Sequence, residues 1–178
     1  MKTLFTFTLV FFYSLIFSQE TQLVNYSEVV KTDSLRKADD LYSQTKMWFV
    51  DAFKNSKYVI QLDDSVNKTI IGEGEIPYSS GVFMGSATTI GVIKFKISIS
   101  AKDGRYKYDI GNFNHVGRTF SFGYITIAED PVIKFGFTST RIKVYKEIKD
   151  KISLNIEPLI LSLKEYMKEN KVSTKQDW

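Results

Sequence analysis

The first residue in this chain that could do chemistry is its single histidine, His115. It lies in the stretch NFNHVG, which we expect to be a loop just past a strand, a position that suits a site. A catalytic triad needs a nucleophile, a base and an orienting acid brought together, and the sequence around His115 offers no recognisable set of partners. We therefore expect a structural, hydrogen-bonded histidine, with ligand contact as the second alternative and catalysis as the third.

Four carboxylates, Asp63, Asp64, Glu73 and Glu75, lie close enough in sequence to suggest paired acids or a cation site. Neither an EF-hand nor an HExxH spacing accompanies them. Aspartate is common in turns, so a polar turn and a solvated strand face explain them better. The chain has no cysteine, which excludes disulfides, thiolate metal sites and cysteine nucleophiles. We predict neither a metal site nor a cofactor.

Gly72 and Gly74 form a short glycine pattern that superficially suggests a phosphate-binding loop. A dinucleotide-binding loop needs a strand before the glycines and a helix that begins directly after them. Here the strand pattern continues and Pro77 follows. We interpret the two glycines as a bulge or a place of close packing.

Five basic residues are predicted to share the outer face of one hairpin. Proteins that bind single-stranded nucleic acid combine a basic groove with exposed aromatic side chains, but the aromatic residues of this hairpin point to the opposite face. The formal net charge of +4 on 178 residues is a mild excess and does not indicate a nucleic-acid-binding protein. We expect a solvated face, with weak contact to anionic glycans or lipid headgroups as the alternative. The five residues are Lys94, Lys96, Lys102, Arg105 and Lys107.

Aromatic residues make up 15% of the chain, and most of them should lie in the core. A curved sheet that grips a long helix can leave an apolar cavity, in which tyrosine hydroxyls would supply the few polar groups of a ligand pocket. Well-packed interiors leave few voids, so a filled core is the alternative. The residues we expect to contact a ligand between helices and sheet are Trp48, Tyr106, Tyr108, Phe113 and His115.

The first 18 residues predict a secretory signal peptide. Lys2 gives a basic start, and an unbroken apolar and hydroxyl run follows from Leu4 to Phe17, just before the small residue Ser18. The run is shorter than the ~20 residues that span a bilayer, and an uncleaved anchor is the alternative. Cleavage near Ser18 would leave residues 19–178 as one exported domain, periplasmic or secreted, without an integral membrane span.

The elements that must position these residues begin with a weak strand pattern over LVNYSEVV, residues 23–30. Asp33 or Ser34 could then cap a helix, because a short side-chain oxygen accepts hydrogen bonds from first-turn amides. Apolar residues recur at three- and four-residue steps as far as Phe53 and predict one buried helix face.

Two strand patterns follow, over residues 58–62 and 69–76. Pro77 should stop the second strand because proline cannot donate to a sheet ladder. Residues 79–91, rich in glycine and small polar residues, predict the longest irregular loop of the fold.

The strongest local signal is a hairpin around Asp103-Gly104, where apolar and polar residues alternate on both sides. A two-residue Asp-Gly loop is typical of a type I′ turn. The residues from Gly111 to Gly117 then break the alternation, and residues 119–128 and 132–138 predict two more strands. The hairpin register places the large apolar groups on one face and pairs Ala101 with Tyr106, Ile99 with Tyr108 and Ile97 with Ile110.

Apolar residues at helical spacing return after Thr140 and continue to Met167. Pro158 lies inside this stripe, so we expect a kink or break near Leu154, whose carbonyl loses its amide partner. The polar tail, residues 168–178, should fray. One apolar sheet face and two apolar helix stripes predict an α+β fold, an antiparallel sheet with two helices packed on one face.

This order of elements, with its WFVDAFKNSKYVIQLDD junction, its ISAKDGRYKYDIGNF hairpin and its closing LILSLKEYMKE, resembles a known family. The family comprises exported Bacteroidota proteins grouped as a domain of unknown function (DUF4468) with a TATA-binding-protein-like (TBP-like) fold. The resemblance covers residues 32–169 and implies the order β-α-β(n)-α. The chain departs from it between Gly117 and Thr140, where the family implies an irregular connection and the sequence predicts strands. The family implies no activity, and a TBP-like fold does not imply DNA binding.

Three functional hypotheses remain. The first is an exported, non-enzymatic binding or accessory protein with a small apolar ligand between helices and sheet. The second is a structural or interaction protein of the envelope, which would use the charged sheet face or residues 79–91. The third is a hydrolase, which would require His115 beside a serine and a carboxylate.

Overall fold

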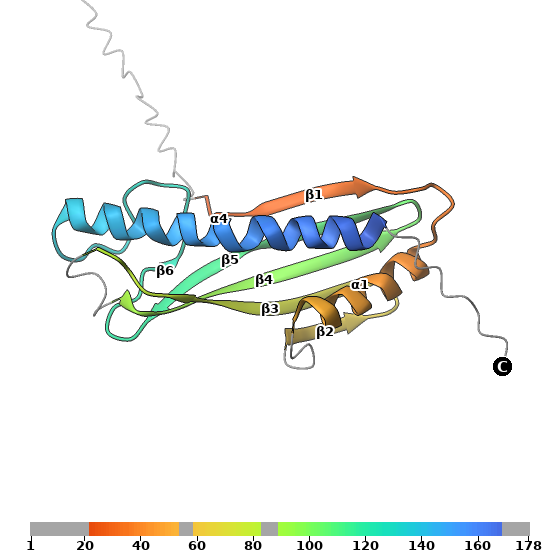
Figure 1. Ribbon diagram of the computed structural model, residues 1–178, viewed down its shortest axis with the longest axis horizontal. Coiled ribbons are helices and arrows are strands. Elements are labelled where there is room, and N and C mark those ends of the chain that lie inside the picture. The colour runs from red at the N-terminus through yellow and green to blue at the C-terminus, as the bar shows by residue number, and fades with distance from the viewer. Residues whose placement is uncertain (1–21, 54–58, 83–88, 169–178) are drawn as a thin grey trace, which may run out of the picture.

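A six-stranded antiparallel sheet carries two helices on one face (Figure 1). The structure is a computed structural model and describes residues 22–53, 59–82 and 89–168; the predicted signal peptide and tail end lie outside them. The strand order is β1-β5-β4-β3-β2, and β6 pairs with β5. The predicted α+β fold is thereby confirmed. Its elements are β1 (Tyr26–Lys31), α1 (Ala38–Ala52), β2 (Ile60–Asp64), β3 (Thr69–Tyr78), β4 (Gly91–Lys102), β5 (Arg105–Gly117), β6 (Gly123–Tyr124) and α4 (Thr138–Lys168).

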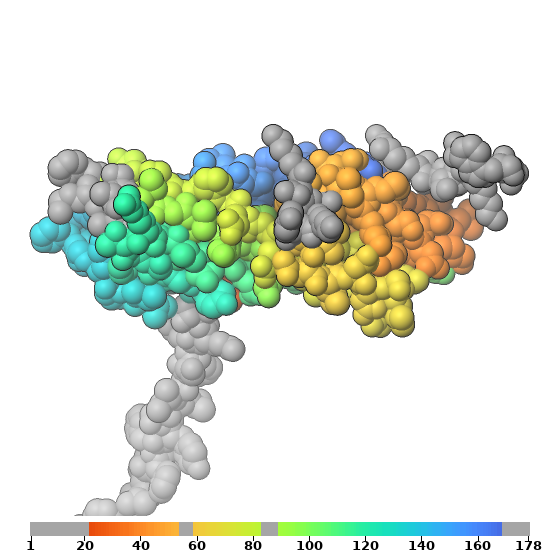
Figure 2. Space-filling view, turned by 90° about the horizontal axis from the view of Figure 1, so that it is seen from below, coloured from red at the N-terminus to blue at the C-terminus, as the bar shows by residue number. Residues whose placement is uncertain are grey.

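The layers follow from the alternation of the strands, because successive side chains point to opposite sheet faces. The apolar set of β3, β4 and β5 is buried beneath α1 and α4, and the charged set faces outward. In the space-filling view α1 and α4 lie along one side of an elongated molecule (Figure 2). No helix of the described ranges has the length and apolar character needed to cross a membrane.

The central hairpin has the predicted register, with Ala101 opposite Tyr106 and Ile99 opposite Tyr108. The turn type is different. A type I′ turn needs positive φ at both central residues, but only Gly104 has it, at +70°. The register is nevertheless as predicted, because the loop still has two residues and the large apolar residues still fall on one face.

The break predicted for residues 111–117 is a bulge inside β5 and not the end of the strand. The pairing with β4 shifts between Lys94 and Lys96, and Asn112 adopts a φ of +54°. An extra residue in a bulge re-aims the side chains that follow. As a result His115 is a buried strand residue, and the predicted loop position was wrong.

Strand β3 continues through Pro77, which was predicted to stop it. Pro77 pairs with Val92 of β4, whereas the pairing of β3 with β2 ends at Gly72. Beyond that point no strand of the described residues pairs with this side of β3, and proline is tolerated at such an edge because it has no amide to donate to a ladder.

Gly72 and Gly74 are places of close packing. A Cβ on Gly72 would lie 2.7 Å from the Phe49 ring, and a Cβ on Gly74 would lie 2.4 Å from the Phe95 ring. Both glycines are buried in β3 beneath aromatic side chains. The interpretation from sequence is confirmed in its close-packing form.

Helix α1 starts later than predicted and has a different cap. Its first residue is Ala38, and Asp33 instead accepts a hydrogen bond from the Leu35 amide in the preceding turn (2.9 Å). The amide of Ala38 donates to Oδ1 of Asp103 (2.8 Å), which lies in the β4–β5 turn. A carboxylate at a helix N-terminus also complements the helix dipole.

Helix α4 is uninterrupted through Pro158, so the predicted break near Leu154 is absent. Leu154 and Pro158 both lie on the solvent side, where water can satisfy the carbonyl that proline leaves without an amide. The predicted apolar stripe is buried against the sheet at Val144, Ile148, Ile152, Ile156, Leu163 and Met167.

The two strands predicted over residues 119–128 and 132–138 were wrong except at the two residues of β6. Val132, in the second of these predicted strands, is 66% exposed, whereas an apolar residue of a core strand would be buried. The connection is irregular, as the family resemblance implied, and is fixed by a bidentate pair in which Arg141 donates to Asp130 at 2.8 and 3.0 Å.

Candidate functional site

The Tyr106 cleft, as we name it, lies between β1 and the C-terminal end of α4. It has a volume of about 390 Å³. Its apolar part comes from Val30 and Met167, and most of the rest is charged. Its lining residues are Glu28, Val30, Lys31, Thr32, Asp33, Arg36, Tyr106, Lys164, Met167 and Lys168.

The hydroxyl of Tyr106 is the unusual group of this cleft. The side chain is 1% exposed, and its hydroxyl has no hydrogen-bond partner among the residues that the structure describes. Burial is the main cause that raises the pKa of Tyr106, and the nearby carboxylate of Glu28 raises it further. A buried hydroxyl without a partner costs on the order of 1–3 kcal/mol. Such a group calls for an explanation, and a bound molecule is one.

Glu28 organises the rim of the cleft. It accepts hydrogen bonds from Lys164 Nζ (2.6 Å) and from the Tyr108 hydroxyl (2.8 Å). These two bonds, the one from Lys164 first, lower the pKa of Glu28. Burial first, and then the bond to Glu28, raises the pKa of Tyr108 to about 12. The rim tyrosine is therefore partnered, whereas Tyr106 beside it is not.

Arg36 lines the cleft and contacts the C-terminal end of α4. Its guanidinium donates to the Met167 carbonyl (2.5 Å) and to the Gln44 side chain. A cation at the C-terminal end of a helix is favourable, because the last carbonyls carry partial negative charge. Four cations and two carboxylates line the cleft, which leaves an excess of two positive charges: Lys31, Arg36, Lys164 and Lys168 against Glu28 and Asp33.

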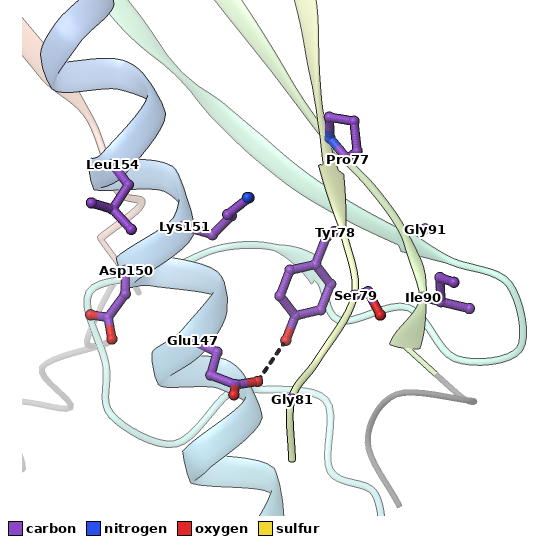
Figure 3. Close-up of a pocket in the computed structure, with 10 residues that line it drawn as sticks. All are labelled: Pro77, Tyr78, Ser79, Gly81, Ile90, Gly91, Glu147, Asp150, Lys151 and Leu154. Carbon is purple, nitrogen blue, oxygen red and sulfur yellow. Dashed lines mark hydrogen bonds between the residues drawn. The ribbon is translucent and has the colours of Figure 1, made fainter. Parts of the chain in front are cut away.

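A second cleft, which we name the Glu147 cleft, lies at the opposite end of α4 and has a volume of about 600 Å³ (Figure 3). Its central carboxylate, Glu147, accepts hydrogen bonds from Ser80 Oγ (2.5 Å) and from the Tyr78 hydroxyl (3.4 Å). Figure 3 shows Tyr78 and Glu147 pointing toward each other across the gap between β3 and α4. The Tyr78, Ser80 and Glu147 side chains satisfy one another, so none of these three needs a ligand as a hydrogen-bond partner.

His115 is buried close to the Glu147 cleft. Its Nδ1 accepts from the Phe122 amide (3.2 Å), so Nε2 carries the proton and donates to the Thr89 carbonyl (2.8 Å). Burial lowers the pKa of His115 and keeps the ring neutral. The Tyr78 ring packs edge-on against it, with centroids 5.3 Å apart. Both ring nitrogens therefore form hydrogen bonds with backbone groups.

The structure does not bring the five predicted ligand residues together. Tyr106 lines the Tyr106 cleft and Tyr108 lies at its rim, but Trp48 is buried between α1 and α4, where Nε1 donates to Ser162 (3.2 Å). Phe113 packs edge-on against Tyr26 in the core, with centroids 6.0 Å apart. His115 lies at the other end of the sheet.

The residues missed by sequence reasoning are Glu28, Arg36 and Lys164. Glu28 and Lys164 are 136 positions apart, and Arg36 reaches a carbonyl 131 positions away. No local pattern marks such pairs, because each is made only when α4 packs beside β1.

The four carboxylates considered as a cation site are dispersed in structural roles. Asp63 accepts from Lys46 (2.5 Å) and from Tyr42, and Asp64 accepts from the Asn67 amide (2.9 Å) in the following turn. Glu73 and Glu75 form ion pairs across strands. Within the described ranges no group of three histidine or carboxylate side chains is arranged to hold a metal ion.

Comparison with solved structures places the chain among TBP-like proteins. A DUF4468 family protein from Bacteroides ovatus superposes with a TM-score of 0.56 and 15% identity, over 84% of this chain and 89% of that one. A TBP-like protein from Parabacteroides distasonis gives a TM-score of 0.50 and 11% identity, over 80% and 93%. At these identities the likeness concerns the fold. No curated protein sequence matches the chain.

The family described as "Domain of unknown function (DUF4468) with TBP-like fold" matches residues 26–116, from β1 to the end of the central hairpin. Its match includes Tyr106 and most of β5, but neither α4 nor Lys164. Because the matched residues make up more than half of the chain, the protein belongs to the DUF4468 family, with a TBP-like fold.

Proposed function

We propose that this protein is an exported, non-enzymatic binding protein that holds a small amphipathic ligand in the Tyr106 cleft. The single observation that supports this function is the buried Tyr106 hydroxyl, which has no partner of its own. A ligand with a polar group at this point would recover the cost of the unpaired hydroxyl.

The lining of the cleft supports the class of ligand. Val30 and Met167 offer apolar contact to the body of a small molecule, and the excess of cations favours a negatively charged head. Ligand sites commonly combine an apolar wall with a few placed polar groups. Export rests on the basic, apolar and small-residue pattern of the first 18 residues.

A binding role is favoured over hydrolysis by the state of His115. A general base needs a free nitrogen within reach of the proton that it removes. One nitrogen of His115 accepts from the Phe122 amide and the other donates to the Thr89 carbonyl. Recruitment to catalysis would break one of these buried hydrogen bonds.

Native mass spectrometry of the protein purified from the envelope of its own host tests the proposal. We expect an extra mass that disappears on denaturation. Tyr106→Phe should retain about one tenth of that ligand, because one hydrogen bond to a buried group is worth about 1.4 kcal/mol. The matched control is Tyr124→Phe, which removes the hydroxyl of an exposed tyrosine in β6 and should retain all of it. A bare protein mass, or equal loading of the two variants, would overturn the proposal.

A further inference from the structure

The outer face of the sheet has two halves. In one half opposite charges are paired across strands, and in the other half cations lie opposite cations. In the first half, on β3 and β4, Lys94 pairs with Glu75 (3.3 Å) and Lys96 pairs with Glu73 (3.5 Å). Each lysine lies directly opposite its glutamate in the register. Opposite charges placed in this way stabilise a sheet.

The second half, at the turn end of the hairpin, carries like charges opposite one another. Arg105 of β5 lies directly opposite Lys31 of β1 on one side and Lys102 of β4 on the other. Residues directly opposite in antiparallel strands point to the same face, so the three form a row that we name the cation ladder. No carboxylate of the described part of the chain is within ion-pair distance of any of the three.

The cation ladder destabilises the sheet and spaces its charges at the distance between strands. Like charges directly opposite each other destabilise a sheet. Neighbouring strands are about 4.8 Å apart, so the row presents three positive charges over about 10 Å. Two residues further along β5, on the same face, Lys107 adds a fourth cation, with Asp109 only at 3.9 Å.

A groove of about 430 Å³ runs beside the cation ladder and spans β1, β4 and β5. It is lined by Lys102, Arg105 and Lys107, by Ser100 and Tyr106, and by one exposed apolar residue, Val29. The lining of the groove is largely apolar, because the aliphatic stems of the basic side chains add to Val29, and the charged ends of these side chains supply positive charge and hydrogen-bond donors.

We propose that the cation ladder and its groove dock an acidic polysaccharide, a chain that carries carboxylates and hydroxyls at short intervals. The row crosses the strands, so a peptide lying along it cannot join the sheet through backbone hydrogen bonds, the usual way in which sheets hold extended peptides. A flat lipid surface does not enter a groove, whereas an extended polymer does. Charge complementarity with the unpaired cations supplies the attraction.

The test measures binding of the purified protein to polygalacturonate, with neutral dextran as the reference polymer. We expect binding to polygalacturonate that weakens as salt is raised, and none to dextran. The double variant Lys102→Gln/Arg105→Gln should bind about tenfold more weakly, as expected for two exposed charge contacts. The matched control, Lys94→Gln/Lys96→Gln, removes two charges from the paired half of the same face and should bind like the wild type.

Thermal unfolding of the same variants separates lost binding from lost folding. Removing charges from the cation ladder relieves repulsion, so Lys102→Gln/Arg105→Gln should unfold at the same temperature as the wild type or higher. Equal weakening of binding by the control variant would overturn the proposal, since net charge alone would then explain it. Binding to vesicles of anionic phospholipid that exceeds binding to polygalacturonate and needs the cation ladder would overturn it in favour of a membrane surface.

Discussion

Strand β5 holds three buried polar rings, Tyr106, Tyr108 and His115, and the first and last of them differ in how their polar atoms are hydrogen-bonded. At one end His115 is 0% exposed, and both its nitrogens are hydrogen-bonded to backbone. At the other end Tyr106 is 1% exposed and its hydroxyl has no partner. Burial alone therefore does not distinguish a structural residue from a binding residue. The distinction lies in whether the buried polar atom is satisfied within the protein.

The same contrast separates the two clefts. The Glu147 cleft is the larger, yet its carboxylate already accepts from Tyr78 and Ser80. The smaller Tyr106 cleft has an excess of cations and is lined by Tyr106, whose buried hydroxyl is unpaired within the described residues. By volume alone the Glu147 cleft would be the candidate ligand site. The unpaired Tyr106 hydroxyl favours the Tyr106 cleft instead.

The largest effect should come from His115→Ala. It deletes a buried ring and its two hydrogen bonds, one to the Thr89 carbonyl and one from the Phe122 amide. We expect the free energy of unfolding to fall by about 3–4 kcal/mol, from the cavity and the two lost buried hydrogen bonds together. Chemical denaturation measures this, and a loss below about 1 kcal/mol would show that His115 is not a structural anchor.

The pH dependence of stability should reveal the same residue. Because the pKa of His115 is lowered in the folded state, mainly by burial, the unfolded chain takes up the proton first. Stability is unaffected by His115 above the unfolded pKa of about 6.5 and falls below it, by up to about 1.4 kcal/mol per pH unit. Denaturation from pH 7 to pH 5.5 measures the slope, and His115→Gln should flatten it. An unchanged slope in that variant would assign the effect to other groups.

A smaller effect is expected from Asp103→Ala at the Tyr106 end. The Ala38 amide would lose the carboxylate that caps α1, so the Tm should fall by about 2–4 °C, as is typical of a lost cap. Differential scanning calorimetry measures it, with Asp33→Ala as the control. A greater loss for Asp33→Ala would restore the cap position that the sequence predicts.

The smallest change in stability is expected from Tyr106→Phe, which completes the comparison with His115. The variant removes an unsatisfied hydroxyl and keeps the ring, so the ligand-free protein should be unchanged or more stable by up to about 1 kcal/mol. Denaturation of the ligand-free form measures it. A loss comparable to that of His115→Ala would mean that the hydroxyl has a structural partner, such as water, and would remove the basis of the binding site.

Much of the fold could be predicted from patterns within single elements. The register of the central hairpin follows from alternating apolar residues, and the buried stripe of α4 follows from helical spacing. The errors occur where one element depends on another. Pro77 remains in β3 because β2 has already ended beside it, and α1 is capped by Asp103, 65 residues away.

The candidate site was predicted only in part, and for the same reason. Tyr106 and Tyr108 were named from their aromatic character, and the structure places them beside one cleft. Trp48, Phe113 and His115 share that character but are buried elsewhere. Sequence indicates that a tyrosine will be buried, but it does not reveal whether another element brings a partner to its hydroxyl.

The sequence by itself determined the fold class and the faces of the strands and helices, because apolar periodicity is a property of neighbouring residues. Its motifs also carried the resemblance to the family. The tertiary structure alone decided that His115 lies in a strand, that Tyr106 lacks a hydrogen-bond partner and that Lys31, Arg105 and Lys102 form one row. Each of these depends on groups far apart in the chain. Their positions are fixed only when the helices pack on the sheet and the strands pair.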